Sequence, residues 1–409
     1  MTSGGNADPT AGPPELRVAL DLTPLLGRAT GIGVFTRTLL KTLARREDLA
    51  TVGFAVTWRG RRELRRLIPP GVTMLTRPMP ARPLRLAWAR TDHPTLEAFG
   101  ARVDLVHGTN YVVPPTRRAA RLVTVHDLTP LHYPELCSRD TLAYPRLVQR
   151  AWQRGAWIHT DSQFVAEEVR EWLKVRPVDA ARVVPIHLGV STPSDPPDRH
   201  HGDPLPGDPQ AGQVLAGAGR YVLALGTIEP RKGLVDLVAA FDEVCAADDP
   251  GREPQDRVAL VVAGPDGWGV HRFEEAVAAC AHRNRIRRLG WVDDRQRADL
   301  LAGATVLAYP SLYEGFGFPP LEAMAAGVPV VCSDAGSLPE VTAGGARHVP
   351  QGDIGALAAA LAELIGENQE ATTRRTALVS AGRARAAELS WDRCTGAMVG
   401  LYRTMVGLG

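Results

Sequence analysis

The sequence predicts an α/β protein with two doubly wound parallel-sheet domains. With 409 residues, the chain exceeds one ordinary hydrophobic core and suits two domains of about 200 residues each. Short apolar runs alternate with segments of helical periodicity in both halves, a pattern typical of parallel sheets covered by helices. Between the halves, the stretch 191–213 is rich in Pro, Gly and Asp and nearly free of aliphatic residues, which indicates an interdomain connection.

The first half begins with residues 1–15, which lack the basic and apolar regions of a secretion signal and are predicted to form a disordered tail. Residues 16–190 form the predicted N-terminal domain. Ser162 precedes a helical segment and is a suitable N-cap, because its hydroxyl can accept from a free backbone amide. Strands are predicted at 17–22, 52–57, 103–107, 121–126, 157–160 and 183–186, and helices at 32–45, 139–154 and 164–172.

The second half follows a linker that we place at 191–218. Residues 219–388 form the predicted C-terminal domain, and a last helix, 391–406, lies in a final segment of 389–409 after the second sheet is complete. The apolar residues of segment 234–245 share one helical face, which predicts core packing. Strands are predicted at 221–225, 258–263, 286–289, 305–309, 328–332 and 346–349.

Composition narrows the class of protein. The net charge of +2 gives no indication of nucleic-acid binding. The five cysteines are scattered, odd in number and form no C-x-x-C pair, so we expect a reducing cytosol without a disulfide framework or structural zinc. No apolar run of 18 residues that could span a membrane occurs. No strand is followed by G-x-G-x-x-G, which disfavours an NAD-dependent dehydrogenase.

Two adjacent cations follow the first strand of the second half. This strand, YVLAL, leads into Gly226 and then to Arg231 and Lys232 before a helix begins. In a doubly wound sheet, ligands bind in the crevice beyond the strand carboxyl ends. Arg can grip two oxygens through its planar fork and Lys adds a compact charge, so the pair suits a diphosphate. Taken alone, the segment fits an ordinary solvated turn equally well.

A glycine-containing turn precedes a second predicted helix. The strand 305–309 leads through Glu314, Gly315 and Gly317 to a proline pair suited to a first helical turn, and Glu322 follows inside the helix. Free amides at a helix start form an anion and hydroxyl site, and the glycines let the backbone approach a ligand closely. Each carboxylate can accept from the two hydroxyls of a vicinal diol. We therefore predict a ligand site here.

The spacing E-x7-E of Glu314 and Glu322, with GTIEPRKG at 226–233, resembles glycosyltransferase family 4. In the first half the resemblance rests on DLTP at 21–24, TGIG at 30–33, VHDL at 125–128 and DSQF at 161–164, and it covers nearly the whole chain from about residue 17. It implies the GT-B fold, in which two Rossmann-like domains face a central cleft and a last helix commonly crosses back to the N-terminal domain. It also implies a nucleotide diphosphate sugar as donor substrate and no further cofactor.

The resemblance assigns most of the donor site to the second half. Arg231 and Lys232 would bind the diphosphate and stabilise the leaving group, while Glu322 would hold the ribose hydroxyls. Glu314 would hold the transferred sugar. The remaining donor-binding positions are Gly226, the backbone of Gly315, Phe316 and Gly317, and Trp291 and Val292 beside the nucleobase.

The first half would complete the site. Gly31 and Gly33 would let a loop close over the phosphates, and His126 would project from a strand end toward the sugar. A histidine there fits a satisfied structural role as well, but the following Asp127 and the family pattern favour function. We predict His126 and Glu314 as the catalytic residues. Because ligand groups come from both halves, closure of the domains is expected.

Bond cleavage at a glycosyl phosphate develops negative charge on the diphosphate, so fixed cations there stabilise the transition state. The chain contains no D-x-D triplet, which predicts a reaction without a metal. Family 4 enzymes retain anomeric configuration, which implies that the departing phosphate oxygen takes the acceptor proton. An epimerase and a catalytically silent nucleotide-sugar-binding protein are the alternatives; a phosphorylase fits poorly, since Lys232 is the one lysine in the C-terminal half available to carry pyridoxal phosphate.

The substrates are less defined. The run from His126 to Pro134 resembles bacterial mannosyltransferases of O-antigen and exopolysaccharide assembly, which favours GDP-mannose, although UDP-glucose, UDP-GlcNAc and deoxyhexose donors stay open. The acceptor is expected to be a cell-envelope glycan or lipid-linked glycan. The segment 59–90 holds nine arginines against the single acidic residue Glu63. It fits peripheral attachment to anionic lipid at the inner face of the plasma membrane, or an ordinary solvated helix face in a cytoplasmic protein.

Overall fold

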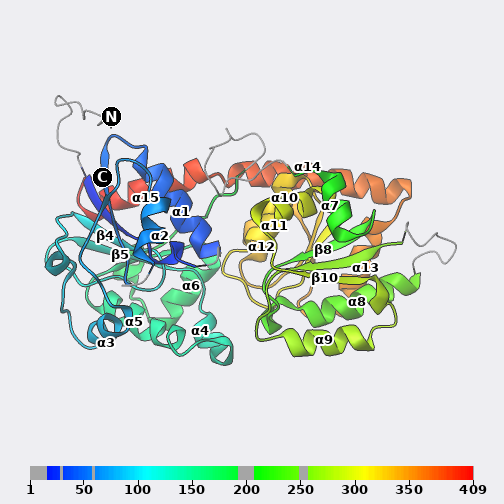
Figure 1. The fold of residues 1–409 in the computed structure, drawn as a ribbon, viewed down its shortest axis with the longest axis horizontal. Helices are drawn as coiled ribbons and strands as arrows, with labels where there is room; N and C mark the ends of the chain where they lie inside the picture. Colours follow the sequence, from blue (N-terminus) through cyan, green and yellow to red (C-terminus); the bar gives the residue numbers. More distant parts are fainter. Residues whose placement is uncertain (1–15, 28–30, 58–59, 192–206, 248–256, 409) are drawn as a thin grey trace.

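The computed structural model describes residues 16–27, 31–57, 60–191, 207–247 and 257–408. Its two domains lie side by side along the long axis of the molecule (Figure 1). Both are parallel sheets with helices on their faces, as the sequence predicts. The predicted tail, 1–15, lies outside the described residues.

The N-terminal domain is a sheet of seven parallel strands in the order β3-β2-β1-β4-β5-β6-β7. Successive residues of β1 enter different cores: Val18 and Leu20 pack on one face and Ala19 on the other, so both faces are covered. The strands are β1 (Leu16–Asp21), β2 (Leu49–Phe54), β3 (Thr73–Met74), β4 (Leu105–Gly108), β5 (Ala120–Val125), β6 (Trp157–Thr160) and β7 (Val183–Pro185). The helices are α1 (Gly31–Ala44), α2 (Arg61–Leu67), α3 (Ala81–Trp88), α4 (Thr129–His132), α5 (Tyr144–Gln153) and α6 (Gln163–Trp172).

The C-terminal domain is a sheet of six parallel strands in the order β10-β9-β8-β11-β12-β13. In both sheets the order in which strands are added reverses beside the first strand of the domain. This topological switch point lies between β1 and β4 in the first sheet and between β8 and β11 in the second. The strands are β8 (Tyr221–Leu225), β9 (Ala259–Ala263), β10 (Ile286–Gly290), β11 (Val306–Tyr309), β12 (Val330–Ser333) and β13 (Arg347–Val349). The helices are α7 (Pro209–Ala216), α8 (Leu234–Ala247), α9 (Val270–Ala279), α10 (Asp294–Gly303), α11 (Phe318–Ala326), α12 (Leu338–Thr342), α13 (Ile354–Ile365) and α14 (Gln369–Glu388).

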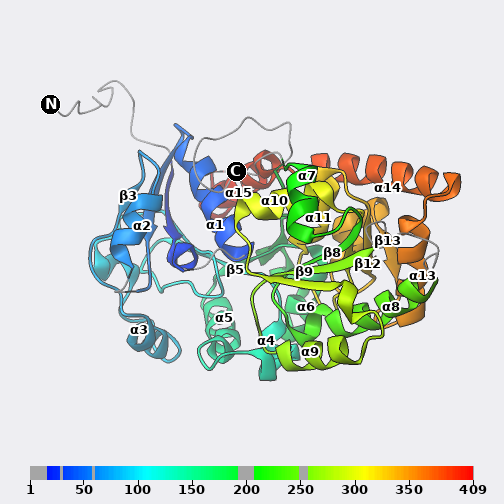
Figure 2. The ribbon, with the colours of Figure 1, turned by 45° about the vertical axis from the view of Figure 1, so that its right-hand side comes forward.

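The last helix, α15 (Trp391–Met405), leaves the C-terminal domain and packs against α1 (Figures 1 and 2). Its Tyr402 is fully buried and bonds to His107 Nδ1 at 2.7 Å. The chain thus crosses between the domains twice, and the two crossings touch where Val190 N donates to Leu389 O at 2.7 Å. The final helix completes the N-terminal domain.

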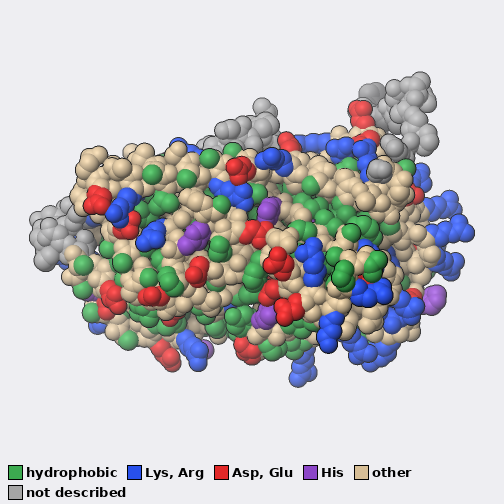
Figure 3. All heavy atoms as spheres, turned by 180° about the vertical axis from the view of Figure 1, so that it is seen from behind, with side chains coloured by type: hydrophobic (Ala, Val, Ile, Leu, Met, Phe, Trp, Pro, Cys, Tyr) green, Lys and Arg blue, Asp and Glu red, His purple; other side chains and the backbone are tan. Residues whose placement is uncertain are grey.

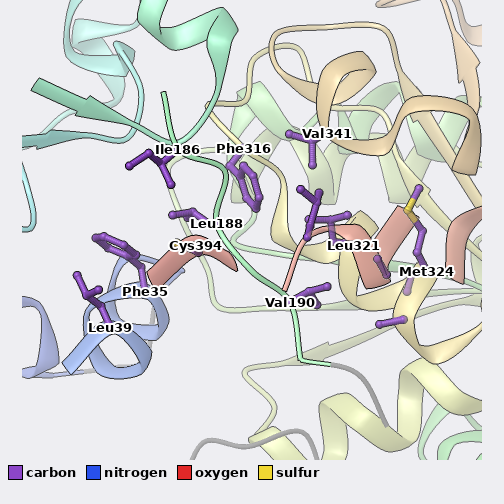
Figure 4. Packing of buried hydrophobic residues seen from close by; sticks show 14 of the residues in the cluster. Phe35, Leu39, Ile186, Leu188, Val190, Phe316, Leu321, Met324, Val341 and Cys394 are labelled. Carbon is purple, nitrogen blue, oxygen red and sulfur yellow. The ribbon is translucent and has the colours of Figure 1, made fainter. Parts of the chain in front are cut away.

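One hydrophobic cluster runs through the domain boundary (Figure 4). Phe35 and Leu39 enter it from α1, Leu188 and Val190 from the first crossing, and Phe316 and Leu321 from the C-terminal domain. Its members include Cys394 of α15 and Val341 of α12. Burial of apolar surface therefore favours contact between the domains.

All twelve predicted strands are present within a few residues of the expected ends, and the largest shift is β2, which begins at Leu49 instead of 52. The predicted helix 139–154 begins later, at Tyr144, with Pro145 in its first turn. The strand β3 and the helices α3, α4, α7, α9, α10, α12, α13 and α14 were not predicted, whereas α2 lies in the segment 59–90, for which a solvated helix face was one of two interpretations. The helix α7 lies in the segment expected to be a linker, and it packs against α10 of the C-terminal domain; residues 192–206 lie outside the described residues.

Candidate active site

The carboxyl ends of β8 and β11 place the predicted donor residues together at the reversal point of the second sheet. The strand β8 leads to the short turn Pro230–Lys232, and β11 leads to Glu314. Lys232 Nζ lies 2.6 Å from Glu314 Oε1, and Arg231 Nη1 lies 3.3 Å from Glu314 Oε2. This is the crevice where a doubly wound sheet binds its ligands.

The two cations are held by further acceptors. Lys232 Nζ also donates to the Tyr309 hydroxyl at 2.8 Å, and that hydroxyl donates to Glu314 Oε1 at 2.9 Å. Arg231 Nε lies 2.9 Å from Glu229 Oε2. Two positive and two negative side chains therefore balance each other around one turn.

Burial and neighbouring charges shift the pKa values of Glu314, Lys232 and Arg231 in opposite directions. Glu314 is 6% exposed; burial acts to raise its pKa, but Lys232 and Arg231 outweigh it and lower the pKa to about 2. Burial lowers the pKa of Lys232 although Glu314 opposes that change. For Arg231, the pKa rises because Glu314 and Glu229 outweigh burial. Glu314 is thus a carboxylate that can only accept hydrogen bonds.

Glycines bring the turn after β11 into contact with the N-terminal domain. A Cβ added at Gly315 would lie 1.8 Å from the backbone oxygen of His126. Gly317 has a φ of +97° and occupies the N-cap position of α11. Gly226 has a φ of +137° at the end of β8. The ring of Phe316 is buried and packs near His187 and Phe318, so its backbone is the part that can face a ligand.

Glu322 lies in α11 and pairs with Arg297 of α10. Arg297 Nε donates to Glu322 Oε2 at 3.0 Å, and Arg297 Nη2 contacts the same oxygen. Any further donor to this carboxylate would therefore have to share it with Arg297 or displace Arg297 from it. Trp291, after β10, is 55% exposed, whereas Val292 is half-buried against the core. Trp291 offers an open aromatic face at the rim of the domain.

His126 follows β5 in the N-terminal domain, and both its ring nitrogens have partners. Nδ1 lies 2.6 Å from Asp161 Oδ2 and Nε2 lies 2.8 Å from the backbone oxygen of Thr109. Both partners are hydrogen-bond acceptors, so this arrangement favours the doubly protonated ring, in which both nitrogens donate. Burial acts to lower the pKa of His126, but Asp161 and the Thr109 carbonyl outweigh it and the pKa rises.

Gly31 and Gly33 lie in the first turn of α1 rather than in a loop, while residues 28–30 before them lie outside the described residues. A Cβ added at Gly31 would lie 3.1 Å from the Phe318 ring of α11, so this helix start faces the C-terminal domain. The glycine at position 31 permits a close approach of the two domains.

Tyr309 and Tyr313 were not predicted as site residues. Tyr309 is the last residue of β11 and bridges Lys232 and Glu314. The Tyr313 hydroxyl forms hydrogen bonds across the domain boundary, accepting from Leu128 N at 2.8 Å and donating to Glu168 at 2.7 Å. Their positions at a strand end and beside Glu314 could have indicated both.

Comparison with known proteins identifies the family. The model for Glycosyltransferase Family 4 matches residues 29–193, and that for Glycosyl transferases group 1 matches residues 211–385. The O-antigen chain mannosyltransferase B of Escherichia coli is 32% identical over 326 residues, which are 79% of this chain and 78% of that protein. The chain belongs to glycosyltransferase family 4.

This family 4 glycosyltransferase is also similar to MMP α-(1→4)-mannosyltransferase of Mycolicibacterium hassiacum, at 32% identity over 248 residues, which are 59% of this chain and 56% of that protein. The solved structure of sucrose-phosphate synthase from Thermosynechococcus elongatus matches with a TM-score of 0.69 and 21% identity, covering 96% of this chain and all of that one. The fold is therefore GT-B, and the protein is an enzyme that transfers a sugar to an acceptor.

The arginine-rich segment of this glycosyltransferase lies on α2, α3 and their connections. Leu64 and Leu84 turn into the core, while arginines at 65, 66, 77, 82 and 90 are exposed. Leu86, between these arginines on α3, is 60% exposed. Figure 3 shows Lys and Arg side chains gathered over the N-terminal domain, on the right in that view. Within the described part of the chain, every helix is too short or too polar to cross a bilayer.

Proposed function

We propose that the protein is a retaining mannosyltransferase that takes mannose from GDP-mannose and adds it to a cell-envelope glycan or lipid-linked glycan. The observation that carries this proposal is the buried cluster of Arg231, Lys232 and Glu314 beside the start of α11. The mannose and the acceptor class are supported by the extended likeness to an O-antigen mannosyltransferase.

Donor binding would exchange partners within the cluster. Lys232 and Arg231 lie 2.6 and 3.3 Å from the Glu314 carboxylate in the structure. A diphosphate carries its own negative charge, so it would draw both cations and release Glu314 to accept from sugar hydroxyls. The amides at the start of α11 add further donors beside the same turn. Replacement of Glu314 by the diphosphate as partner of the two cations would thus form the diphosphate site and free Glu314 to bind the sugar.

The same cations would assist the reaction. Breaking the bond between the anomeric carbon and the phosphate oxygen leaves negative charge on the diphosphate, which Arg231 and Lys232 would stabilise more strongly in the transition state than in the ground state. In a retaining reaction the departing phosphate oxygen would take the proton of the acceptor hydroxyl. Neither step requires a metal ion, in keeping with the missing D-x-D triplet.

His126 would act from the N-terminal side. Its pairing with Asp161 fixes the orientation of the ring and favours its positively charged form. We propose that Nε2 exchanges the Thr109 carbonyl for a sugar hydroxyl when the donor binds, so that an imidazolium lies near the departing diphosphate. Glu322 and Trp291 would hold the nucleoside, with Glu322 on the ribose and Trp291 on the base.

The acceptor would reach the cleft from the cytoplasmic face of the membrane. The exposed arginines at 65, 66 and 82, with the exposed Leu86, suit peripheral contact with anionic lipid. Since Leu64 and Leu84 are buried, the contact would be mainly electrostatic. Binding to anionic vesicles that weakens as salt rises supports this location, and no binding at low salt excludes it.

The test is thermal unfolding of the purified protein with GDP-mannose, UDP-glucose or a dTDP-hexose. At a donor concentration of about 100 times Kd, binding stabilises the native state by about 2.7 kcal/mol. We expect this stabilisation with GDP-mannose but not with UDP-glucose or a dTDP-hexose. Lys232→Ala should abolish the shift, whereas Arg374→Ala, in an ion pair with Glu370 within α14, should keep it. A selective response to a UDP-sugar would refute the mannose donor, and a transferred sugar with inverted configuration would refute retention.

A further inference from the structure

Helix α6 of the N-terminal domain directs its first turn across the domain boundary. The amides of Gln163 and Phe164 open this helix and have no acceptor within it. Both donate to the carboxylate of Glu340 in the C-terminal domain, Gln163 N to Oε1 at 2.7 Å and Phe164 N to Oε2 at 2.9 Å. A carboxylate of one domain therefore completes a helix of the other, and the helix dipole favours its negative charge.

A third donor reaches the same carboxylate. His187 Nε2, in the first crossing between the domains, lies 2.5 Å from Glu340 Oε1. Burial acts to raise the pKa of Glu340, but the hydrogen bonds from His187, Gln163 and Phe164 outweigh it, and the pKa lies below its usual value. All of these donors belong to residues outside the domain that carries Glu340.

The Glu340 contact is joined directly to the donor-binding turn. Ser337, at the start of α12, donates its amide to the backbone oxygen of Glu314 at 3.0 Å. On the other side, Ser162, the N-cap of α6, donates its hydroxyl to the backbone oxygen of Gly315 at 2.8 Å. Arg385 of α14 fixes α12 by donating to the backbone oxygen of Glu340 at 2.9 Å. The turn thus lies between α12 and α6.

We propose that Glu340 is a positioning residue of the transfer reaction, because its contact with α6 holds the domains closed and keeps the turn of residues 314–317 against His126. The part that concerns the sugar rests on the proposed function of this turn; the closure does not. Release of the carboxylate opens the cleft and lets donor and product exchange. Hydrogen bonds to a charged group are stronger than those between neutral groups, so losing them should lower the ratio of closed to open molecules at least tenfold.

Closure can be measured without any substrate. Small-angle scattering and single-molecule distance measurements between the domains would compare the wild type with Glu340→Gln and Glu340→Ala. Glu340→Gln keeps one acceptor oxygen and should open partly, and Glu340→Ala should open further. The matched control is Glu370→Gln, which removes an exposed carboxylate paired with Arg374 within α14. It should leave the distances unchanged, and unfolding midpoints would verify that each variant is folded.

Activity then tests positioning. The kcat/KM for transfer from GDP-mannose should fall at least tenfold in Glu340→Ala and less in Glu340→Gln, and the control should keep it. Interdomain distances in Glu340→Ala equal to those of the wild type would overturn the proposal. If the wild type does not turn over GDP-mannose, the proposed function fails, while the scattering comparison still decides the role of Glu340 in closure.

Discussion

Neutralising Glu314 tests the electrostatic arrangement of the site most directly. Glu314→Gln keeps the shape of the side chain but removes the charge between Lys232 and Arg231. The pKa of Glu314 falls from 4.5 to about 2 on folding, which at about 1.4 kcal/mol for each pH unit corresponds to about 3 kcal/mol. Because the folded pKa is lowered, this stabilisation is present above pH 4.5 and is lost as the pH falls toward 2.

We therefore expect Glu314→Gln to lower the free energy of unfolding by about 3 kcal/mol at pH 7, measured by urea denaturation, with a difference that shrinks below pH 4.5. The variant should also bind GDP more tightly, since the cations lose their internal partner, and its kcat should fall about 100-fold or more. Glu274→Gln, in an exposed pair with Arg288, should change stability by less than about 0.5 kcal/mol. Equal urea midpoints for Glu314→Gln and the wild type at pH 7 would refute the reasoning.

Three further outcomes follow from the structure. Gly315→Ala places a Cβ 1.8 Å from the His126 oxygen and should widen the interdomain distance in scattering while lowering kcat at least tenfold; Gly396→Ala, in open space, should do neither. Asp161→Asn should lower the free energy of unfolding most at pH 6 and less at higher pH. The pKa of His126 is raised by folding, so the stabilisation from its ion pair is fully present below pH 6.5 and is lost as the pH rises through the pKa of the folded state. A loss of stability that does not depend on pH would contradict the ion pair. Burial raises the pKa of Asp21 to about 6, so ionisation of this buried carboxyl removes about 3 kcal/mol from the free energy of unfolding between pH 4 and pH 6. In urea titrations, Asp21→Asn should therefore be more stable than the wild type at pH 7 but not at pH 4.

The sequence predicts the two sheets and the residues at their strand ends because both depend on local pattern. Apolar runs and glycine turns identify β8 and β11, and parallel strands bring their carboxyl ends to one edge, so Lys232 and Glu314 were expected in one site. Their direct contact was not expected, since it joins side chains 82 positions apart in the chain. Local patterns do not reveal such pairings.

The other features of the structure that were not predicted also depend on contacts between residues far apart in the sequence. The pairing of Glu322 with Arg297 and the two acceptors around His126 depend on how separate elements pack, which spacing does not fix. The helix α7 was hidden because its flanking residues are rich in Pro and Gly, and it is held by packing on α10 rather than by a strong periodic pattern of its own. The contacts of Glu340 across the domain boundary could not be predicted either, because two of its partners are backbone amides and the third, His187, lies 153 positions away in the chain.

The position of α15 means that the N-terminal folding unit is not a continuous piece of chain. Tyr402 supplies the partner of His107 deep inside that unit, and Arg403 reaches Asp48 at 2.5 Å. A fragment ending at residue 190 would lack α15. It would expose the surface that this helix covers and leave His107 Nδ1 without its hydrogen-bond partner, the Tyr402 hydroxyl. The N-terminal domain can therefore finish folding only when α15 is present, and truncations that remove α15 should destabilise the N-terminal domain rather than the C-terminal domain that α15 follows in the chain.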